Sequence, residues 1–303
     1  MQYSMNTTPC ILEPAWSRVI TRPQRRVIRG ATRLLTAPLF HVDAFARRPF
    51  EGNPAAVCLP SRPCSKEWMQ QVAAEMNVSE TAFVVPTFGG FDLRWFTPTG
   101  EVSLCGHATL AAAHVLWETG QVAERSEVRF RTRSGPLIAR RVDGSIELNL
   151  PSRPVVETRQ IPRAARIALD VSPISVGRTL EQAPENADFV VELEGEAAVC
   201  AVRPDFATLR SVPGGVIVTA RADDPQYDFV SRYFAPWWGI DEDPVTGSAH
   251  CALAPYWAGR LGKTKLVGRQ VSARGGVVEA PMDGDRVHLC GRAVTVSQGV
   301  LVA

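Results

Sequence analysis

The sequence predicts an α/β (α+β) protein built from two related halves. Short β-type runs alternate with helical segments along residues 38–303. The segment RWFTP at 94–98 reappears as RYFAP at 232–236, and each copy precedes a helix that opens with glycine. The second copy follows the first by 138 residues at these strands and by 141 at the helix starts. A near-constant offset of this kind indicates two related domains.

The first half opens with two strands and a helix. LFHVDAF from Leu39 is a β-type run, and AAVCLP after the turn-rich RRPFEGNP is a second strand. Apolar residues then recur every four positions behind Ser65. This spacing predicts a helix over 65–77 with Ser65 as its N-cap.

Further strands and an alanine-rich helix complete this half. NVSETAFVVP and FDLRWFTP are strand-like, CGHATLAAAHVLWETG is a helix closed by Gly120, and EVRFRTRSGPLIARRVDGSIELNL gives strands joined by SG and DG turns. PSRP at 151–154 has the composition of a linker. We therefore expect a first domain at 38–152 and a second at 153–303, with the last strand able to return to the first.

Residues 1–36 differ in composition from the rest of the 303-residue chain. They hold six arginines, no lysine and one acid, for a charge of +5, whereas residues 37–303 carry −3. Pro14 and Pro23 interrupt any long amphipathic helix of the transit-peptide type. We expect residues 1–37 to be a basic, disordered extension outside the fold.

Composition and charge exclude several classes of function. Basic and acidic side chains nearly balance, 33 against 31, so the electrostatic pattern of a nucleic-acid-binding protein is missing. No apolar run approaches the length of a membrane helix, so no membrane partner is expected. The seven cysteines are scattered and odd in number, which favours reduced thiols and a cytoplasmic location over a disulfide framework.

The cysteines and histidines also lack the spacing of metal ligands. Cys58 and Cys64 have no second pair and no neighbouring histidine. His107 and His114 have no acidic residue that completes an HExxH pattern. We therefore expect no metal site.

The two glycine-led helices suggest a binding cleft. A helix N-terminus attracts anions because its first N–H groups are unpaired and its dipole is positive there. Gly106 and Gly247 permit close backbone approach, while His107 and Ser248 offer polar side chains at the same helix entrances. Two such helix ends facing one cleft would hold a carboxylate. Plain N-capping by these side chains is the alternative interpretation.

Five motifs in order resemble the phenazine biosynthesis PhzF-like family over nearly all of 38–303. The resemblance implies a diaminopimelate-epimerase-like fold: two pseudo-symmetric domains, each a curled, mainly antiparallel sheet around a central helix, with the active site between them. The expected protein is a homodimeric isomerase that needs no cofactor. The motifs are VDAF with FEGNPAAV (42–57), NVSETAFVVP (77–86), FTPTGEVSLCGHATLAAA (96–113), FAPWWGIDEDPVTGSAH (234–250) and GRAVTVSQG (291–299).

The family enzyme moves a proton within trans-2,3-dihydro-3-hydroxyanthranilate, and the resemblance assigns its acid/base glutamate to Glu80. Glu80 lies between a serine and the apolar run TAFVV, surroundings that would desolvate a carboxylate. His107, Asp243 and Ser248 match the remaining catalytic polar groups, with proton relay and substrate positioning as their implied work. An exposed strand-end glutamate and a surface acid before a helix are the alternatives for Glu80 and Asp243.

The resemblance also implies a set of substrate-binding groups. Gly106 and Gly247 would give backbone N–H groups to the carboxylate of a small-molecule substrate, while Asn53 and Ser79 would border the site. An aromatic-like ring would suit the aromatic residues near the two helix starts, unless these belong to the core. These residues are Trp95, Phe96, Trp237 and Trp238.

Cys105 raises a second mechanism, because epimerases and racemases of this fold use one cysteine from each half. The second half places Asp243 and Pro244 near the position of the other thiol, and Cys251 comes after its helix has begun. A thiol-assisted epimerase using Cys105 therefore remains the alternative, with Cys105 as auxiliary acid or as a small buried apolar residue.

Two other classes of function stay open. A hydrolase is disfavoured, because TGSAH at 246–250 does not match the G-x-S-x-G nucleophile motif. A non-catalytic small-molecule binding protein would keep the cleft without turnover, and fold alone does not distinguish it from an enzyme.

Overall fold

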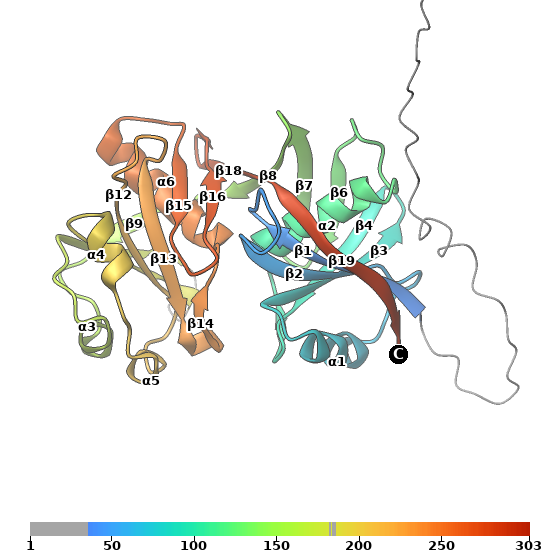
Figure 1. Ribbon diagram of the computed structural model, residues 1–303, viewed down its shortest axis with the longest axis horizontal. Helices are drawn as coiled ribbons and strands as arrows, with labels where there is room; N and C mark the ends of the chain where they lie inside the picture. The colour runs from blue at the N-terminus through green and yellow to red at the C-terminus, as the bar shows by residue number, and fades with distance from the viewer. Residues whose placement is uncertain (1–35, 182, 184–185) are drawn as a thin grey trace, which may run out of the picture. The chain divides into compact units, whose positions relative to one another are not determined.

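The computed structural model describes residues 36–181, 183 and 186–303 (Figure 1). Nearly all of the basic segment expected at 1–37 therefore lies outside the described residues. Strand β1 begins at Thr36, two residues before the expected domain start, because Thr36 pairs with Val302 of the last strand. The chain from residue 35 onward forms one compact unit.

The first half follows the predicted order of elements. Ser65 caps α1 as predicted, because its Oγ accepts the backbone N–H of Trp68 at 3.2 Å. The bounds are β1 Thr36–Ala44, β2 Asn53–Cys58, α1 Lys66–Met76, β3 Glu80–Thr87, β4 Gly90–Phe96, β5 Glu101–Val102, α2 Gly106–Glu118, β6 Val128–Thr132, β7 Gly135–Val142 and β8 Ser145–Pro151.

The second half repeats this order with three extra short helices. Its bounds are β9 Val155–Glu157, α3 Arg163–Leu169, β10 Ser175–Thr179, β11 Phe189–Glu192, α4 Glu196–Ala201, α5 Phe206–Leu209, β12 Val216–Arg221, β13 Phe229–Ala235, the 3-10 helix η3 Pro236–Trp238, β14 Ile240–Asp243, α6 Gly247–Leu261, β15 Val267–Gln270, β16 Gly276–Glu279, β17 Met282–Asp283, β18 Arg286–Gly291 and β19 Ala293–Val302.

The strand pairings show the same topology in both halves. In the first, β1–β2, β3–β4, β4–β5, β6–β7 and β7–β8 are antiparallel, while β2–β3 and β4–β6 are parallel. In the second, β10–β11, β12–β13, β13–β14, β15–β16 and β16–β18 are antiparallel, while β11–β12 and β13–β15 are parallel. The two pseudo-symmetric, mainly antiparallel halves predicted from the sequence are confirmed.

The two sheets are joined by paired and exchanged strands. Strand β8 of the first half pairs antiparallel with β18 of the second. After β8 the chain forms β9, which pairs with β10, and after β18 it forms β19, which returns to pair with β1. Figure 1 shows β19 running from β18 across the first half beside β1. The sheet of the first half is therefore completed by β19, a strand from the end of the second half.

Each half encloses one buried helix. In α2 and α6 most residues are buried on every side, and many of them are alanines. A helix that is apolar all round must be surrounded by protein, and small side chains let the curled sheet approach it closely. The sheets therefore fix the positions of the N-termini of both helices.

The duplication extends to matched ion pairs beside the helices. Arg94 of β4 binds both carboxylate oxygens of Glu101 at 2.8 Å and lies over the ring of Phe96 at 5.1 Å. Arg232 of β13 does the same with Glu242, at 2.7 and 2.8 Å, over the Phe234 ring. Bidentate pairs of this type hold the strands that lead into the two helices.

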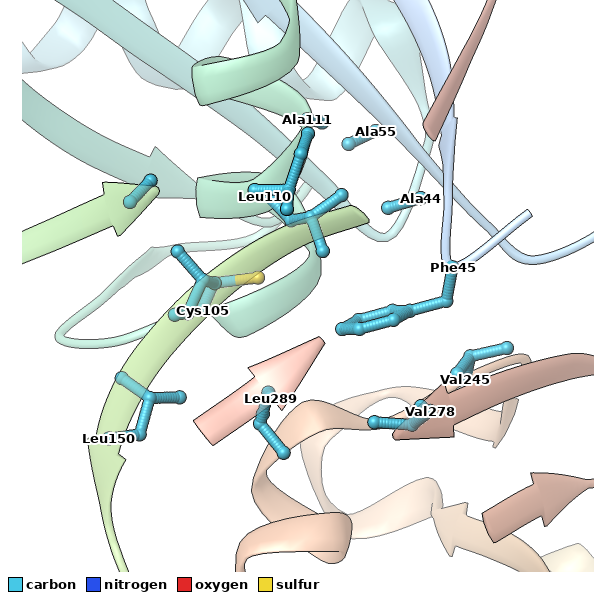
Figure 2. Packing of buried hydrophobic residues seen from close by; sticks show 14 of the residues in the cluster. Ala44, Phe45, Ala55, Cys105, Leu110, Ala111, Leu150, Val245, Val278 and Leu289 are labelled. Carbon is cyan, nitrogen blue, oxygen red and sulfur yellow. The ribbon is translucent and has the colours of Figure 1, made fainter. Parts of the chain in front are cut away.

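One hydrophobic core crosses the junction between the halves. Phe45, which follows β1, extends its ring into the gap between Leu110 and Leu289, with Val245 and Val278 of the second half below it in the view of Figure 2. Leu110 of α2 and Leu289 of β18 belong to the same buried cluster. Apolar burial on this scale makes the junction a rigid part of the fold rather than an open cleft.

Removing residues 1–35 is expected to leave the melting temperature unchanged, because the described strand pairings begin at Thr36. Removing residues 1–41 deletes most of β1, which pairs with both β2 and β19. That deletion should lower the melting temperature by roughly 10 °C or more. Circular dichroism melts of both truncated proteins measure the difference. A large fall in melting temperature on removal of residues 1–35 would contradict the prediction.

Candidate active site

The two helix starts meet at their glycines. A Cβ built on Gly106 would lie 3.6 Å from the Cα of Gly247, and one built on Gly247 would lie 3.5 Å from the Cα of Gly106. The residues before them, Cys105 and Thr246, make no side-chain capping bond. His107 and Ser248 lie within the first helical turn, so the plain N-capping interpretation of these side chains is wrong.

A cavity of about 630 Å³ opens beside this contact. It is lined by both halves, with Glu80, Gly106 and His107 from the first and Asp243 and Gly247 from the second. Cavities of this volume hold small molecules. Ser248 also lines the cavity, and its side chain is exposed. The cavity therefore brings together all the catalytic residues predicted from the sequence and the two predicted glycines.

Glu80 and His107 form a carboxylate–imidazole contact in the wall of the cavity. Glu80 is the first residue of β3, His107 lies in the first turn of α2, and Oε2 of the carboxylate lies 3.1 Å from Nε2 of the imidazole. Both atoms are buried and have no other hydrogen-bond partner among the described residues. The exposed 12% of the Glu80 side chain is therefore the part of this pair that can meet a molecule in the cavity.

Asn53 connects this pair to the second half. It is fully buried, and its Nδ2 donates to Oδ1 of Asp243 at 2.8 Å and lies 3.2 Å from Nδ1 of His107. Ser79 donates to Oδ1 of Asn53 at 3.3 Å. Asn53 and Ser79, which were expected to border the substrate, stand behind the cavity wall and hold the side chains that line it.

Asp243 is held by short hydrogen bonds in a buried position. Thr246 donates from Oγ1 to Oδ2 of Asp243 at 2.5 Å. Burial raises the pKa of Asp243 from 3.8 to about 6, and the nearby Glu80 carboxylate adds to this, although His107 and the hydrogen bonds oppose it. A carboxyl group with such a pKa exchanges protons near neutral pH, as an acid/base group requires.

The pKa of His107 is also raised, but here the neighbouring groups raise it and burial opposes them. Burial lowers its pKa, but the Cys105 sulfur, 3.5 Å from Nδ1, and the Glu80 carboxylate raise it well above the usual value. Burial raises the pKa of the Cys105 thiol to about 11, with the Glu80 charge adding to the rise. A thiol with this pKa is protonated at neutral pH, so the charge of Cys105 contributes to the raised pKa of His107 only at higher pH, where the thiol is ionised.

The second-half residue that corresponds to Cys105 is Thr246, since each immediately precedes its helix. Asp243 and Pro244, which the sequence analysis placed near this position, lie three and two residues before Thr246. Cys251 lies one turn inside α6 and also lines the cavity, and burial raises its pKa to about 12. No second thiol stands opposite Cys105 at the paired helix start.

The sequence analysis missed a buried ion-pair network at the other end of the cavity. Arg153, in the expected linker, binds Glu181 at 2.7 Å and Asp188 at 2.5 Å. Tyr233 donates to Asp188 at 3.0 Å. A signal for Tyr233 was present, because it occupies the position of Trp95 in the repeated motif and adds a hydroxyl group to an otherwise apolar position.

The aromatic residues near the helix starts divide into two pairs. Trp95 and Phe96 are core residues, 1% and 0% exposed. Trp237 and Trp238 are 43% and 45% exposed, and Trp238 lines the cavity. Only the second pair is therefore placed to meet a ligand.

Glu80, Cys105 and His107 also deserve consideration as metal ligands. Their donor atoms all lie within 4.8 Å of one another, a spacing that would suit a metal ion. The absence of a metal requirement expected from the sequence therefore stays a prediction. Among the described residues, no helix combines the length and the apolar character that crossing a membrane demands.

Two curled sheets around opposed helix starts form a fold that this chain shares with a known epimerase. A hydroxyproline epimerase from Agrobacterium vitis has the same fold, with a TM-score of 0.56 at 12% identity over 88% of this chain and 92% of its own. The sequence matches the phenazine biosynthesis-like protein family over residues 42–299, and the chain belongs to that family.

Relatives in this family are similar over nearly their whole length. A protein of Halalkalibacterium halodurans named an uncharacterized isomerase is 43% identical over 89% of this chain and 100% of its own, and one of Pseudomonas aeruginosa is 49% identical over 86% and 97%. A PhzF family crystal structure from Enterococcus faecalis has a TM-score of 0.78 at 40% identity, over 89% and 100%. The enzyme class is that of an isomerase.

The raised pKa of Asp243 makes a prediction for stability. The folded state binds the Asp243 proton more tightly than the unfolded state, so this stabilisation is present below about pH 4 and is lost as the pH rises through about 6. We compare the free energy of unfolding of the wild type with that of Asp243→Asn at each pH. The wild-type value should fall relative to the variant by about 3 kcal/mol as the pH rises from about 4 to neutral. Urea denaturation across this range measures it.

The control is Asp241→Asn, which removes an exposed carboxylate two residues away. It should leave the difference from wild type nearly constant with pH. A constant difference between wild type and Asp243→Asn would show that Asp243 has an ordinary pKa.

Proposed function

We propose that the protein is a cofactor-free isomerase that moves a proton within a small carboxylate metabolite resembling trans-2,3-dihydro-3-hydroxyanthranilate. The observation that carries this proposal is the contact between Glu80 and His107. The two groups meet at 3.1 Å in a cavity that also contains Asp243 and the starts of two helices. Membership of an isomerase family supports the reaction class.

The substrate carboxylate would bind at the paired helix starts. The first N–H groups of α2 and α6 are not capped by the side chains before them, and both helix dipoles present their positive ends there. Gly106 and Gly247 leave the backbone accessible, and the exposed Ser248 side chain adds a hydroxyl donor. A carboxylate therefore has two converging sets of donors.

Glu80 is the proposed base. It takes a proton from the activated carbon, and the electron pair of that C–H bond enters the conjugated system, which accepts a proton at another carbon. No oxidant or reductant is consumed. His107 contacts Glu80 and holds its carboxylate in place, and Asp243, with a pKa of about 6, supplies the second group that exchanges protons.

The cavity wall supports a substrate with an apolar ring. Leu104, Leu150, Trp238 and Ile240 line it beside the polar groups at the helix starts. An amphipathic molecule with a carboxylate at one end and a flat ring at the other would satisfy both surfaces. The substrate class proposed from the sequence has this form.

Glu80→Gln keeps the shape of the side chain and removes the base. Isomerisation and solvent deuterium exchange should fall about a hundredfold to ten-thousandfold, while substrate binding survives because the carboxylate donors are elsewhere. Mass spectrometry in heavy water, over a panel of small cyclic carboxylates that includes trans-2,3-dihydro-3-hydroxyanthranilate, measures both. The control is Glu124→Gln, whose side chain is 83% exposed.

Cys105→Ala distinguishes this mechanism from the thiol alternative. It should keep most of the exchange activity, since the thiol is neutral and has no partner thiol at Thr246. An active Glu80→Gln together with an inactive Cys105→Ala would identify a thiol-assisted epimerase. Tight binding without any exchange in the wild type would identify the non-catalytic binding protein.

Exhaustive chelation should leave the activity unchanged, because the proposed chemistry needs only side chains. Dialysis against EDTA and 1,10-phenanthroline, followed by metal analysis and the exchange assay, tests this. Loss of activity that zinc restores would assign Glu80, Cys105 and His107 to a metal centre instead.

The homodimer and the cytoplasmic location expected from the sequence also stay proposals. Sedimentation of the purified protein tests the first, and cell fractionation tests the second.

A further inference from the structure

A second cavity, of about 510 Å³, lies at the junction of the halves and shares no lining residue with the candidate active site. We call it the arginine cavity, because five arginines line it against three acidic residues. The arginines are Arg47, Arg48, Arg269, Arg274 and Arg292, and the acids are Glu51, Asp224 and Glu279.

The arginines differ in whether their guanidinium groups already bind a partner within the protein. Arg274 is a structural residue that binds Asp43 at 2.6 Å and the backbone oxygen of Gly52 at 2.9 Å. Arg48 pairs with Glu51. Within the part of the chain that is described, the side chains of Arg47 and Arg292 have no ion pair and no hydrogen bond. These two arginines are 245 residues apart in the sequence, yet both line the cavity.

The wall of the arginine cavity is a preformed loop at residues 45–52. The Ala46 N–H donates to the carbonyl of Arg292 at 3.1 Å, and the Gly52 N–H donates to that of Gly275 at 2.7 Å. Gly52 has φ +67°, and a Cβ there would lie 2.1 Å from the carbonyl oxygen of Ala44. The loop therefore holds Arg47 against the second half in a fixed backbone conformation.

We propose that the arginine cavity binds a small multivalent anion. Guanidinium groups form paired hydrogen bonds with phosphate and carboxylate oxygens, and the two unpaired ones, Arg47 and Arg292, can serve one ligand from two sides. The volume is that of a small-molecule site. The proposal does not depend on the isomerase chemistry, because it uses a different cavity and different side chains.

The arginine cavity is connected to the active site through one segment. The loop at 45–52 passes directly into Asn53, which contacts both His107 and Asp243. An anion that braces this loop would therefore also brace the residue that links the acid/base groups of the two halves. An anion that binds the folded protein and not the unfolded chain also raises the melting temperature.

Isothermal titration calorimetry with inorganic pyrophosphate and, separately, citrate tests the proposal on the full chain. We expect one site per chain for at least one of them, with a dissociation constant of about a millimolar or tighter. Binding of pyrophosphate alone identifies a phosphate ligand, binding of citrate alone identifies a polycarboxylate, and binding of both identifies a general site for multivalent anions.

The double variant Arg47→Ser, Arg292→Ser should weaken binding by about tenfold or more and remove the rise in melting temperature. The matched control is Arg159→Ser, Arg163→Ser, which removes the same charge from exposed positions outside the cavity. It should bind like the wild type. Absence of binding by both anions, or an equal loss in the control, would overturn the proposal.

Discussion

The close approach of α2 and α6 at Gly106 and Gly247 is the constraint on which the rest of the structure depends. Each helix is enclosed by its own sheet, and the sheets are joined through β8 and β18. The N-termini can therefore meet in only one arrangement. A Cβ on Gly106 would meet the other helix at an ordinary contact distance of 3.6 Å, whereas one on Gly247 would lie 3.2 Å from the side chain of Leu289, which would have to shift. Two positive helix ends at one point favour a bound anion there, and the titratable groups beside them are buried by the same contact.

The acid/base groups show how burial and charge act together. Asp243, in the second half, has its pKa raised by burial, whereas His107, in the first half, has its pKa raised by the Cys105 sulfur and the Glu80 carboxylate in spite of burial. Asn53 contacts both. The site therefore depends on the alignment of the halves to within hydrogen-bond distance. The pairing of β19 with β1, the pairing of β8 with β18 and the core around Phe45 maintain this alignment.

Much of the fold and part of the site could be predicted from the sequence. The repeated motif predicted the duplication. It recurs in both halves because Arg94 and Arg232 make the same contacts, each with a glutamate on the next strand and with a phenylalanine ring. The same motif could not reveal Arg153, because Arg153 and its partners Glu181 and Asp188 all lie outside the motif. Local patterns report what a residue pairs with nearby. They do not report contacts such as that of Asn53 with Asp243, 190 residues away.

The central claim is that the paired helix starts bind the substrate carboxylate beside Glu80. A crystal structure of the protein with bound benzoate, a flat monocarboxylate, tests it most directly. The account predicts carboxylate oxygens about 3 Å from the first N–H groups of α2 and α6, with the ring against Trp238. A carboxylate bound elsewhere, with the helix starts in contact only with water, would contradict it.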